Sequence, residues 1–180
     1  AAGAARLVRA GKAGGVRVAA EVTPHHLLLT EEAVRSWDAN TRMAPPLRTK
    51  RDAEALIEAL ADGTIDCVAT DHAPHAAEEK ELEYSAAPFG IVGLETALGL
   101  ILTNLVHTKI LSLMQAVAKV TTAPRKLLNL PAVRLQEGMP ANLTLFALEK
   151  KWQVDRNRFF SKTRKTAFPG RGLTWAGFGV

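Results

Sequence analysis

Apolar and polar residues follow two kinds of pattern along the first half of the chain, one typical of helices and one typical of strands. Apolar residues at helical spacing predict three helices, over residues 4–12, 30–37 and 50–61. Runs rich in apolar and β-branched residues predict two strands, over residues 16–22 and 65–70. The second run reads as a strand buried on both faces, as in a parallel sheet. Helices and strands that alternate with short joints therefore indicate a parallel α/β arrangement.

The pattern changes twice in the second half. Residues 76–87 form a charged, Glu-rich stretch that predicts a long loop, which in a compact domain is usually functional or mobile. Three more helices are predicted after it, over residues 93–106, 111–120 and 122–128. From residue 133 onward, short apolar runs are separated by Gly- and Pro-containing turns, which is typical of β-structure. We therefore expect two domains, residues 1–132 and residues 133–180.

Composition narrows the classes of protein. The chain has 180 residues, 47% of them hydrophobic, and a net charge of +5. Much of the positive excess lies in residues 150–171, without a nucleic-acid-binding module, so we expect a solvated or anion-attracting surface and no nucleic acid. The longest apolar run, residues 93–106, contains Glu95 and Asn104, which argues against a membrane span. The single Cys67 lies in a predicted strand as an inert thiol, which fits a reducing cytoplasm.

Both predicted strands end in proline and histidine. The first runs into Thr23–His26 and the second into Asp71–His75. Barrels of parallel strands carry their chemistry at the carboxyl ends of the strands, so these ends are the candidate active site. Asp71 must be paired, hydrogen-bonded or metal-bound there. It is either part of a structural Asp–His network or a metal ligand or general base.

The histidines leave the nature of the site open. His25 and His26 either hydrogen-bond to hold their loop or ligate a metal, although neighbouring residues on a strand point in opposite directions. A hydrolytic zinc site uses three or more protein ligands and keeps an open position. The chain has no His-x-His pair and no Cys-x-x-Cys. Either the site is not metallic, or its other ligands lie on sequence outside this chain.

Four short segments carry a more specific signal. They are Glu21–Leu27 (EVTPHHL), Ala44–Arg48 (APPLR), Ala69–His75 (ATDHAPH) and Pro88–Gly90 (PFG). Together they resemble the dihydroorotase family, in the class with a two-zinc amidohydrolase barrel. The resemblance runs along essentially the whole chain, since residues 138–145 and 161–172 are similar to the closing β-segment of that family.

The resemblance implies an α/β fold, namely the C-terminal part of a TIM-type (β/α)8 amidohydrolase barrel followed by segments of a small β-domain. The chain would hold the last two barrel strands, and most ligands of two zinc ions would precede residue 1. By itself the chain would be inactive and poor in metal. Asp71 would be the final metal ligand and the catalytic base. His75, Phe89 and Gly90 would contact the substrate, and His25 and His26 would be a signature rather than ligands.

The implied activity is the reversible interconversion of dihydroorotate and N-carbamoyl-L-aspartate in pyrimidine biosynthesis. Ala44 departs from the family, which usually has a substrate-contacting asparagine at this position. The resemblance admits a homodimer or aspartate carbamoyltransferase as a partner. Two other functions stay open: a non-catalytic subunit that scaffolds aspartate carbamoyltransferase, and a hydantoinase- or dihydropyrimidinase-type cyclic amidase.

Overall fold

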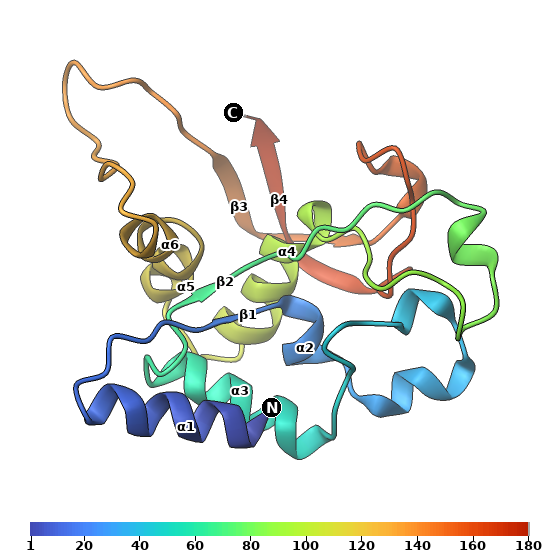
Figure 1. Ribbon diagram of the computed structural model, residues 1–180. Coiled ribbons are helices and arrows are strands. Elements are labelled where there is room, and N and C mark those ends of the chain that lie inside the picture. The colour runs from blue at the N-terminus through green and yellow to red at the C-terminus, as the bar shows by residue number, and fades with distance from the viewer. Residues whose placement is uncertain (180) are drawn as a thin grey trace.

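The computed structural model describes residues 1–179, which form a helical layer, a short parallel sheet and a long β-ribbon (Figure 1). The α-helices are α1 (Ala2–Ala13), α2 (Pro24–Leu28), α3 (Lys50–Ala61), α4 (Leu94–Ile101), α5 (Leu113–Val120) and α6 (Thr122–Leu127). The strands are β1 (Glu21–Val22), β2 (Cys67–Val68), β3 (Leu145–Gln153) and β4 (Gly172–Gly179). Shorter helical turns are η1 (Glu31–Ser36), η2 (Ala39–Thr41), η3 (Glu79–Glu81), η4 (Leu102–Val106) and η5 (Arg156–Arg158).

The parallel pair β1–β2 is the centre of the first part of the chain. Glu21 lies opposite Cys67 and Val22 opposite Val68. The segment between the two strands contains α2 and α3, so the pair is joined by a helical crossover, as the sequence pattern predicts. Both strands are shorter than predicted. A β-strand is defined by its hydrogen bonds to a neighbouring strand. Within the described residues, β1 and β2 pair only with each other, and only where they lie side by side.

Most predicted helices are present, with local differences. The prediction for residues 50–61 is confirmed as α3, whose first turn is capped by Thr49. Residues 31–36 form a 3₁₀ helix, and the helix predicted over 93–106 ends its α-helical part at Ile101 and continues as a π-helical turn. None of the helices in the described part of the chain is long and apolar enough to cross a membrane.

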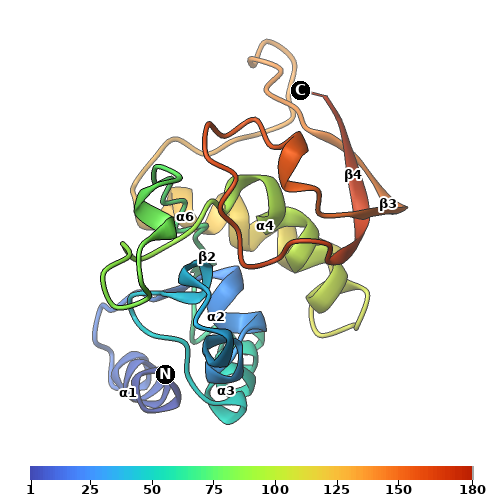
Figure 2. The same ribbon diagram turned by 90° about the vertical axis from the view of Figure 1, so that its right-hand side faces the viewer.

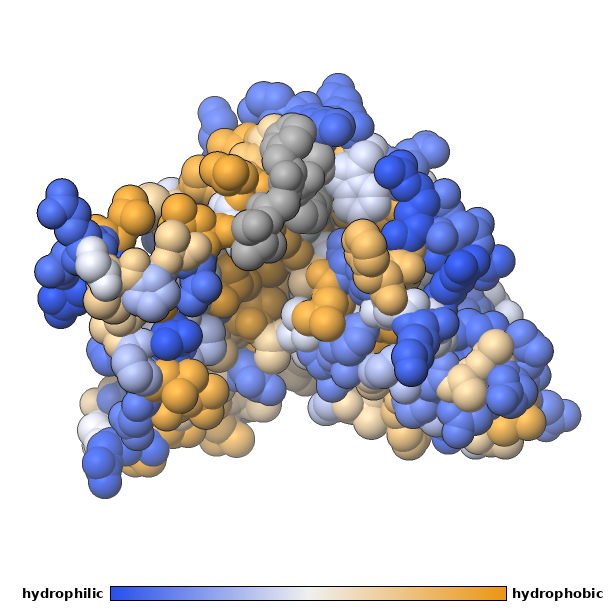
Figure 3. Space-filling view, turned by 90° about the horizontal axis from the view of Figure 1, so that it is seen from above, coloured by the Kyte–Doolittle hydropathy of each residue, from blue (hydrophilic) through white to orange (hydrophobic). Residues whose placement is uncertain are grey.

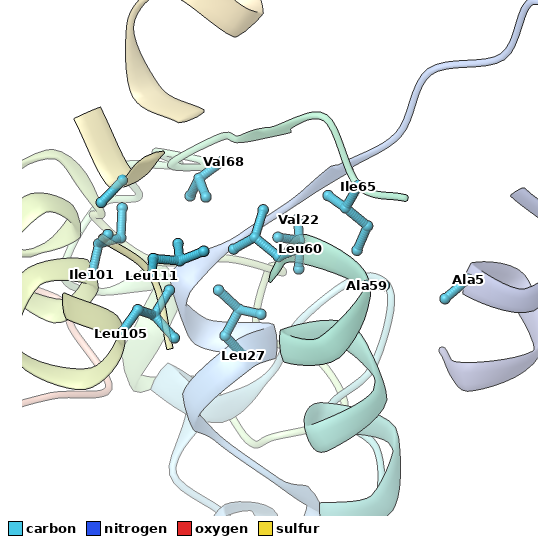
Figure 4. Packing of buried hydrophobic residues seen from close by; sticks show 11 residues of the cluster. Ala5, Val22, Leu27, Ala59, Leu60, Ile65, Val68, Ile101, Leu105 and Leu111 are labelled. Atoms are coloured by element: carbon cyan, nitrogen blue, oxygen red, sulfur yellow. The ribbon is translucent and has the colours of Figure 1, made fainter. Parts of the chain in front are cut away.

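The main core lies between the parallel pair and its helices. Its side chains come from β1, β2, η4 and helices α1 to α5, and Ala5 of α1 lies at its edge (Figure 4). Burial of a leucine or isoleucine side chain contributes about 1.5–3 kcal/mol, so this cluster holds the two strands against the helices. Its members are Ala5, Val22, Leu27, Ala59, Leu60, Ile65, Val68, Ile101, Leu105, Leu111 and Ala116.

A second buried cluster connects the β-ribbon to the rest. β3 and β4 pair antiparallel, with register shifts between Leu145 and Phe146 and between Ala147 and Lys151. Leu173 of β4 and Phe168 belong to the same buried cluster as Leu100 of α4 and Met43. The ribbon therefore packs against α4, which the second view also shows (Figure 2). The predicted division into residues 1–132 and 133–180 stays a prediction.

Large apolar side chains remain exposed along segment 127–145. Viewed from above, apolar surface lies between polar margins (Figure 3). The exposed members of this segment are Leu127, Leu128, Leu130, Val133, Leu135, Met139, Leu143 and Leu145.

Candidate active site

Asp71 is held just beyond the carboxyl end of β2. The strand ends with Ala69 N–H donating to Val22 O, at 3.0 Å, and Asp71 then turns the chain with a φ of 49°. This left-handed conformation is uncommon for residues other than glycine, although aspartate and asparagine are enriched in it. The carboxylate is about half exposed, with 49% of the side chain accessible. Asp71 is therefore available to a ligand rather than buried in a structural network.

The segments on either side of Asp71 lock it in place. His72 pairs with Ile91 in a parallel bridge, and Ala73 N–H donates to Ile91 O at 2.9 Å. The His72 ring accepts the Gly93 N–H at Nδ1, at 3.1 Å. A side chain at Gly93 would place its Cβ 2.6 Å from Thr70 O, so only glycine allows this close approach of the two segments.

His25 lies close to Asp71. Its Nε2 lies 3.8 Å from Asp71 Oδ2, too far for a hydrogen bond. The ring is only 2% exposed, and its Nε2 finds no hydrogen-bond partner among the described residues. Burial, followed by the proximity of His26, lowers the pKa of His25 to about 3. At this distance His25 and Asp71 are not hydrogen-bonded, so this pair does not form an Asp–His network.

His25 and His26 lie on a helix, which corrects the sequence analysis. It placed them at a strand end, with opposed directions, but Pro24 and the Thr23 cap begin the short helix α2 here. His26 Nε2 donates to Pro45 O at 2.8 Å, so its Nδ1 accepts the Thr23 hydroxyl at 2.7 Å. Both nitrogens of His26 are engaged, which favours its structural alternative.

His75, Phe89 and Gly90 come together although fourteen or more positions separate His75 from the other two. His75 Nε2 donates to Phe89 O at 2.8 Å. Gly90 has a φ of 97°, and its N–H donates to Arg42 O at 2.9 Å. The Arg42 guanidinium lies over the Phe89 ring, 4.3 Å from its centroid, in cation–π geometry. The sequence analysis missed Arg42, because a lone arginine in an irregular segment gives no local signal.

The candidate residues open onto two clefts. A cleft of about 550 Å³ has Asp71 and Ala44 on its wall. A second cleft of about 590 Å³ has His75 on its wall and is strongly basic. Its cationic wall residues are Arg156, Lys162, Arg164 and Lys165. The described residues thus place Asp71 and His75 at the walls of different clefts.

A metal site is incomplete in this part of the protein. Within residues 1–179, no group of three or more His, Cys, Asp and Glu side chains is placed to hold a metal ion. Asp71 offers a free carboxylate and His25 an unpartnered Nε2, which together fall short of the three ligands of a zinc site. The described donors by themselves do not fit a zinc ion.

The chain is similar over nearly its whole length to part of each of two curated proteins. The chain is 52% identical over 178 residues to a dihydroorotase of Pelotomaculum thermopropionicum, covering 97% of this chain and 42% of that protein. It is 52% identical over 165 residues to a dihydroorotase of a Geobacillus species, covering 92% of this chain and 39% of the relative. The chain thus spans about two-fifths of the length of these relatives.

Solved structures agree on the fold. The L-hydantoinase (dihydropyrimidinase) of Arthrobacter aurescens superposes with a TM-score of 0.90 at 30% identity, over 98% of this chain and 40% of that one. The dihydropyrimidinase of Brevibacillus agri gives 0.89 at 23% identity, over 97% and 40%, which bears on the fold alone. These matches confirm the predicted α/β class as part of a TIM-type barrel. Residues 4–168 match the amidohydrolase family, and the chain belongs to it.

Proposed function

We propose that the protein carrying this chain is a dihydroorotase, which hydrolyses the ring amide of dihydroorotate to N-carbamoyl-L-aspartate and catalyses the reverse reaction. The observation that supports it most is the identity of 52% to proteins named dihydroorotase over nearly the whole chain. The matched hydantoinase structure is 30% identical, although its backbone superposes well. Fold alone does not select a substrate within such a superfamily, so the closer sequence match decides.

Asp71 is the proposed catalytic base. Water adds to the carbon of the ring amide, and the C–N bond of that amide breaks. Asp71 takes the proton of the attacking water and delivers it to the departing ring nitrogen. A half-exposed carboxylate on the wall of a cleft can reach a substrate in this way, and it is held by the turn at φ 49°.

His75, Phe89 and Gly90 are the proposed substrate-binding residues. The Phe89 carbonyl is taken by His75, and both the amide and the carbonyl of Gly90 are also bonded within the protein. The Phe89 N–H donates to no acceptor among the described residues. We therefore assign the backbone contact to substrate to the Phe89 N–H.

Zinc is the proposed metal, with two ions in the complete enzyme. Bound zinc would lower the pKa of a water molecule and polarise the ring carbonyl. Asp71 would be one ligand, and the remaining ligands would come from outside the described residues. Removing the metal with a chelator should abolish turnover, and adding zinc back should restore it.

The Asp71→Asn variant of the complete enzyme tests the proposal. We expect turnover of dihydroorotate to fall by about 10³-fold or more, because proton transfer by a positioned group contributes about 10²–10⁴-fold. The fold should persist, since Asp71 accepts no hydrogen bond from the described residues and its side chain is half exposed. Glu54→Gln, on the exposed face of α3, is the matched control and should behave as wild type. Substantial activity in Asp71→Asn would remove Asp71 from the mechanism.

A substrate panel separates the alternatives. Wild-type enzyme should hydrolyse dihydroorotate far better than hydantoin or dihydrouracil. Preference for hydantoin would favour the second candidate, a hydantoinase, which the TM-score of 0.90 supports. If none of the three substrates is hydrolysed, the third candidate function, a non-catalytic subunit, is favoured. Ala44, which lines the first cleft together with Asp71, would then contribute to the loss of activity.

The proposal extends to the protein's surroundings. We propose a small-molecule substrate, a cytoplasmic location, and either a second copy or aspartate carbamoyltransferase as the protein partner. The basic cleft beside His75 would favour an anionic substrate. Size-exclusion chromatography with and without the carbamoyltransferase distinguishes the two partners.

A further inference from the structure

Lys80 is a buried lysine in the middle of the charged loop. It lies in η3 and is only 5% exposed, although the sequence analysis interpreted residues 76–87 as a charged loop that is functional or mobile. Its Nζ donates to three carbonyl oxygens: Ala39 at 2.7 Å, Pro88 at 2.9 Å and Gly90 at 2.9 Å. A single side chain therefore connects η2, η3 and the Pro88–Gly90 segment.

The three carbonyls match the chemistry of an ammonium group. A lysine ammonium has three N–H donors and a neutral amine only two, so all three bonds require the charged form. Among the described residues, Lys80 forms no ion pair with a carboxylate. Burial, opposed by Asp38 and reinforced by Arg42 and Lys165, lowers the pKa of Lys80 to about 8. A buried cation without a counter-ion is costly, and here only the carbonyls compensate it.

The carbonyls that Lys80 holds flank the candidate substrate contact. Of three successive carbonyls, Pro88 and Gly90 bond to Lys80, and Phe89 between them bonds to His75. Adjacent peptide planes are thus fixed from two sides. The Phe89 N–H and the Pro88 carbonyl belong to the same planar peptide unit. The bond from Lys80 to the Pro88 carbonyl therefore also fixes the direction of the Phe89 N–H, which has no acceptor among the described residues.

We propose that Lys80 is a positioning residue that sets the Pro88–Gly90 backbone, and through it the Phe89 N–H, for binding of the cyclic amide substrate. The inference rests on the proposed function. Lys80 itself touches no substrate and acts through Phe89. Without it, the Pro88 and Gly90 carbonyls lose their donor and the segment is free to rotate its peptide planes. Binding of substrate is therefore expected to suffer more than the chemical step, which depends on Asp71.

The variant Lys80→Met in the complete enzyme tests this. Methionine retains a long apolar side chain and removes all three donors. We expect KM for dihydroorotate to rise about 10-fold or more, with kcat within about 3-fold of wild type, since displacement of a positioning group by about an ångström has effects of this order. Lys50→Met is the matched control, because Lys50 is exposed on α3 and forms an ion pair with Glu54, which is also exposed, so its kinetics should be unchanged. A folded Lys80→Met enzyme with wild-type KM overturns the proposal.

The pH dependence of KM gives a second measurement that requires only folded wild-type enzyme. The charged or titratable groups around Lys80 are Asp38, Arg42, His75, Glu79, Glu81 and Lys165. Wild-type KM should rise above about pH 8, as the Lys80 ammonium loses the proton that one carbonyl needs. Lys50→Met should show the same rise, and Lys80→Arg should not, because a guanidinium keeps its charge. A wild-type KM that is flat to about pH 10 overturns the proposal even if Lys80→Met fails to fold.

The wild-type assay separates this inference from the proposed function. If wild type prefers hydantoin or dihydrouracil to dihydroorotate, the proposed function fails, and the comparison of Lys80→Met with Lys50→Met is made on the preferred substrate. If none of the three is hydrolysed, both proposals are overturned.

Discussion

Gly90→Ala is the substitution for which the structure predicts the sharpest effect. Gly90 has a φ of 97°, where an L-residue is strained. The strain of a left-handed conformation contributes about 1–2 kcal/mol. The added Cβ would also lie 2.7 Å from the Cβ of Ala73. Ala73 has no χ angle with which to move away, and its N–H is bonded to Ile91 O.

The clash adds to the conformational strain. Forcing an extra methyl group into a packed site costs about 1–3 kcal/mol, so the total is about 2–5 kcal/mol in the free energy of unfolding. Gly63→Ala is the matched control, with a φ of 85° and no atom within 4 Å of the added Cβ. It should show only the strain of about 1–2 kcal/mol. The difference between the two variants isolates the contact with Ala73.

Guanidinium titrations of the complete enzyme, followed by circular dichroism, measure both variants. Gly90→Ala should unfold at lower denaturant than Gly63→Ala, with an unchanged slope, which shows that stability rather than compactness has changed. Equal midpoints for the two alanine variants would refute the contact with Ala73, and with it the tight approach of residues 72–75 to residues 89–93.

Two further predictions concern the first part of the chain. Asp62 is desolvated, which raises its pKa, but hydrogen bonds from Thr64 and Arg9 outweigh this and lower the pKa to about 2. The stabilisation from Asp62 is present above its unfolded pKa of about 4 and is lost as the pH falls through about 2. Asp62→Asn should therefore be less stable at neutral pH, by less than about 1 kcal/mol because the pair is partly exposed. The difference should shrink towards about pH 3 in urea titrations, since urea is uncharged and does not screen the ion pair. A difference independent of pH would contradict the ion pair with Arg9. Leu60→Ala should cost about 2–5 kcal/mol, because Leu60 is 1% exposed in the main core. Leu7→Ala, at a side chain that is 72% exposed, should stay within about 0.5 kcal/mol of wild type in the same titrations. Equal losses would contradict the assigned core.

The sequence predicted a helix correctly where the signals for it lie within one or a few helical turns. Helix α3 has the bounds that its apolar spacing predicted, and the structure adds the Thr49 cap at its start. The helix predicted over residues 111–120 is present as α5, and Ser112 caps it in a capping box with Gln115. Such signals act within one helical turn, so no distant contact is needed to recognise them.

The error at His25 and His26 shows where local interpretation is weakest. A five-residue helix is too short to display a 3.6-residue period, so the apolar run before it dominated the prediction. Thr23 followed by Pro24 was the available signal, since threonine is a common N-cap and proline is favoured at the first helical position.

The sequence by itself determined the α/β class and identified the candidate catalytic and binding residues. The Asp71 carboxylate follows a buried strand, and Gly90 permits a positive φ. Both features follow from the residue types alone. The resemblance to a known family added their proposed roles.

Only the tertiary structure decided which of these residues meet. The bond from His75 to Phe89 spans 14 positions, and the bond from Lys80 to Ala39 spans 41. In the sequence, Lys80 is one charged residue among several glutamates. In the structure, it is bonded to the carbonyls of Ala39, Pro88 and Gly90. Burial and hydrogen-bond partners depend on how the whole chain packs, and a local pattern carries no information about partners so far away along the sequence.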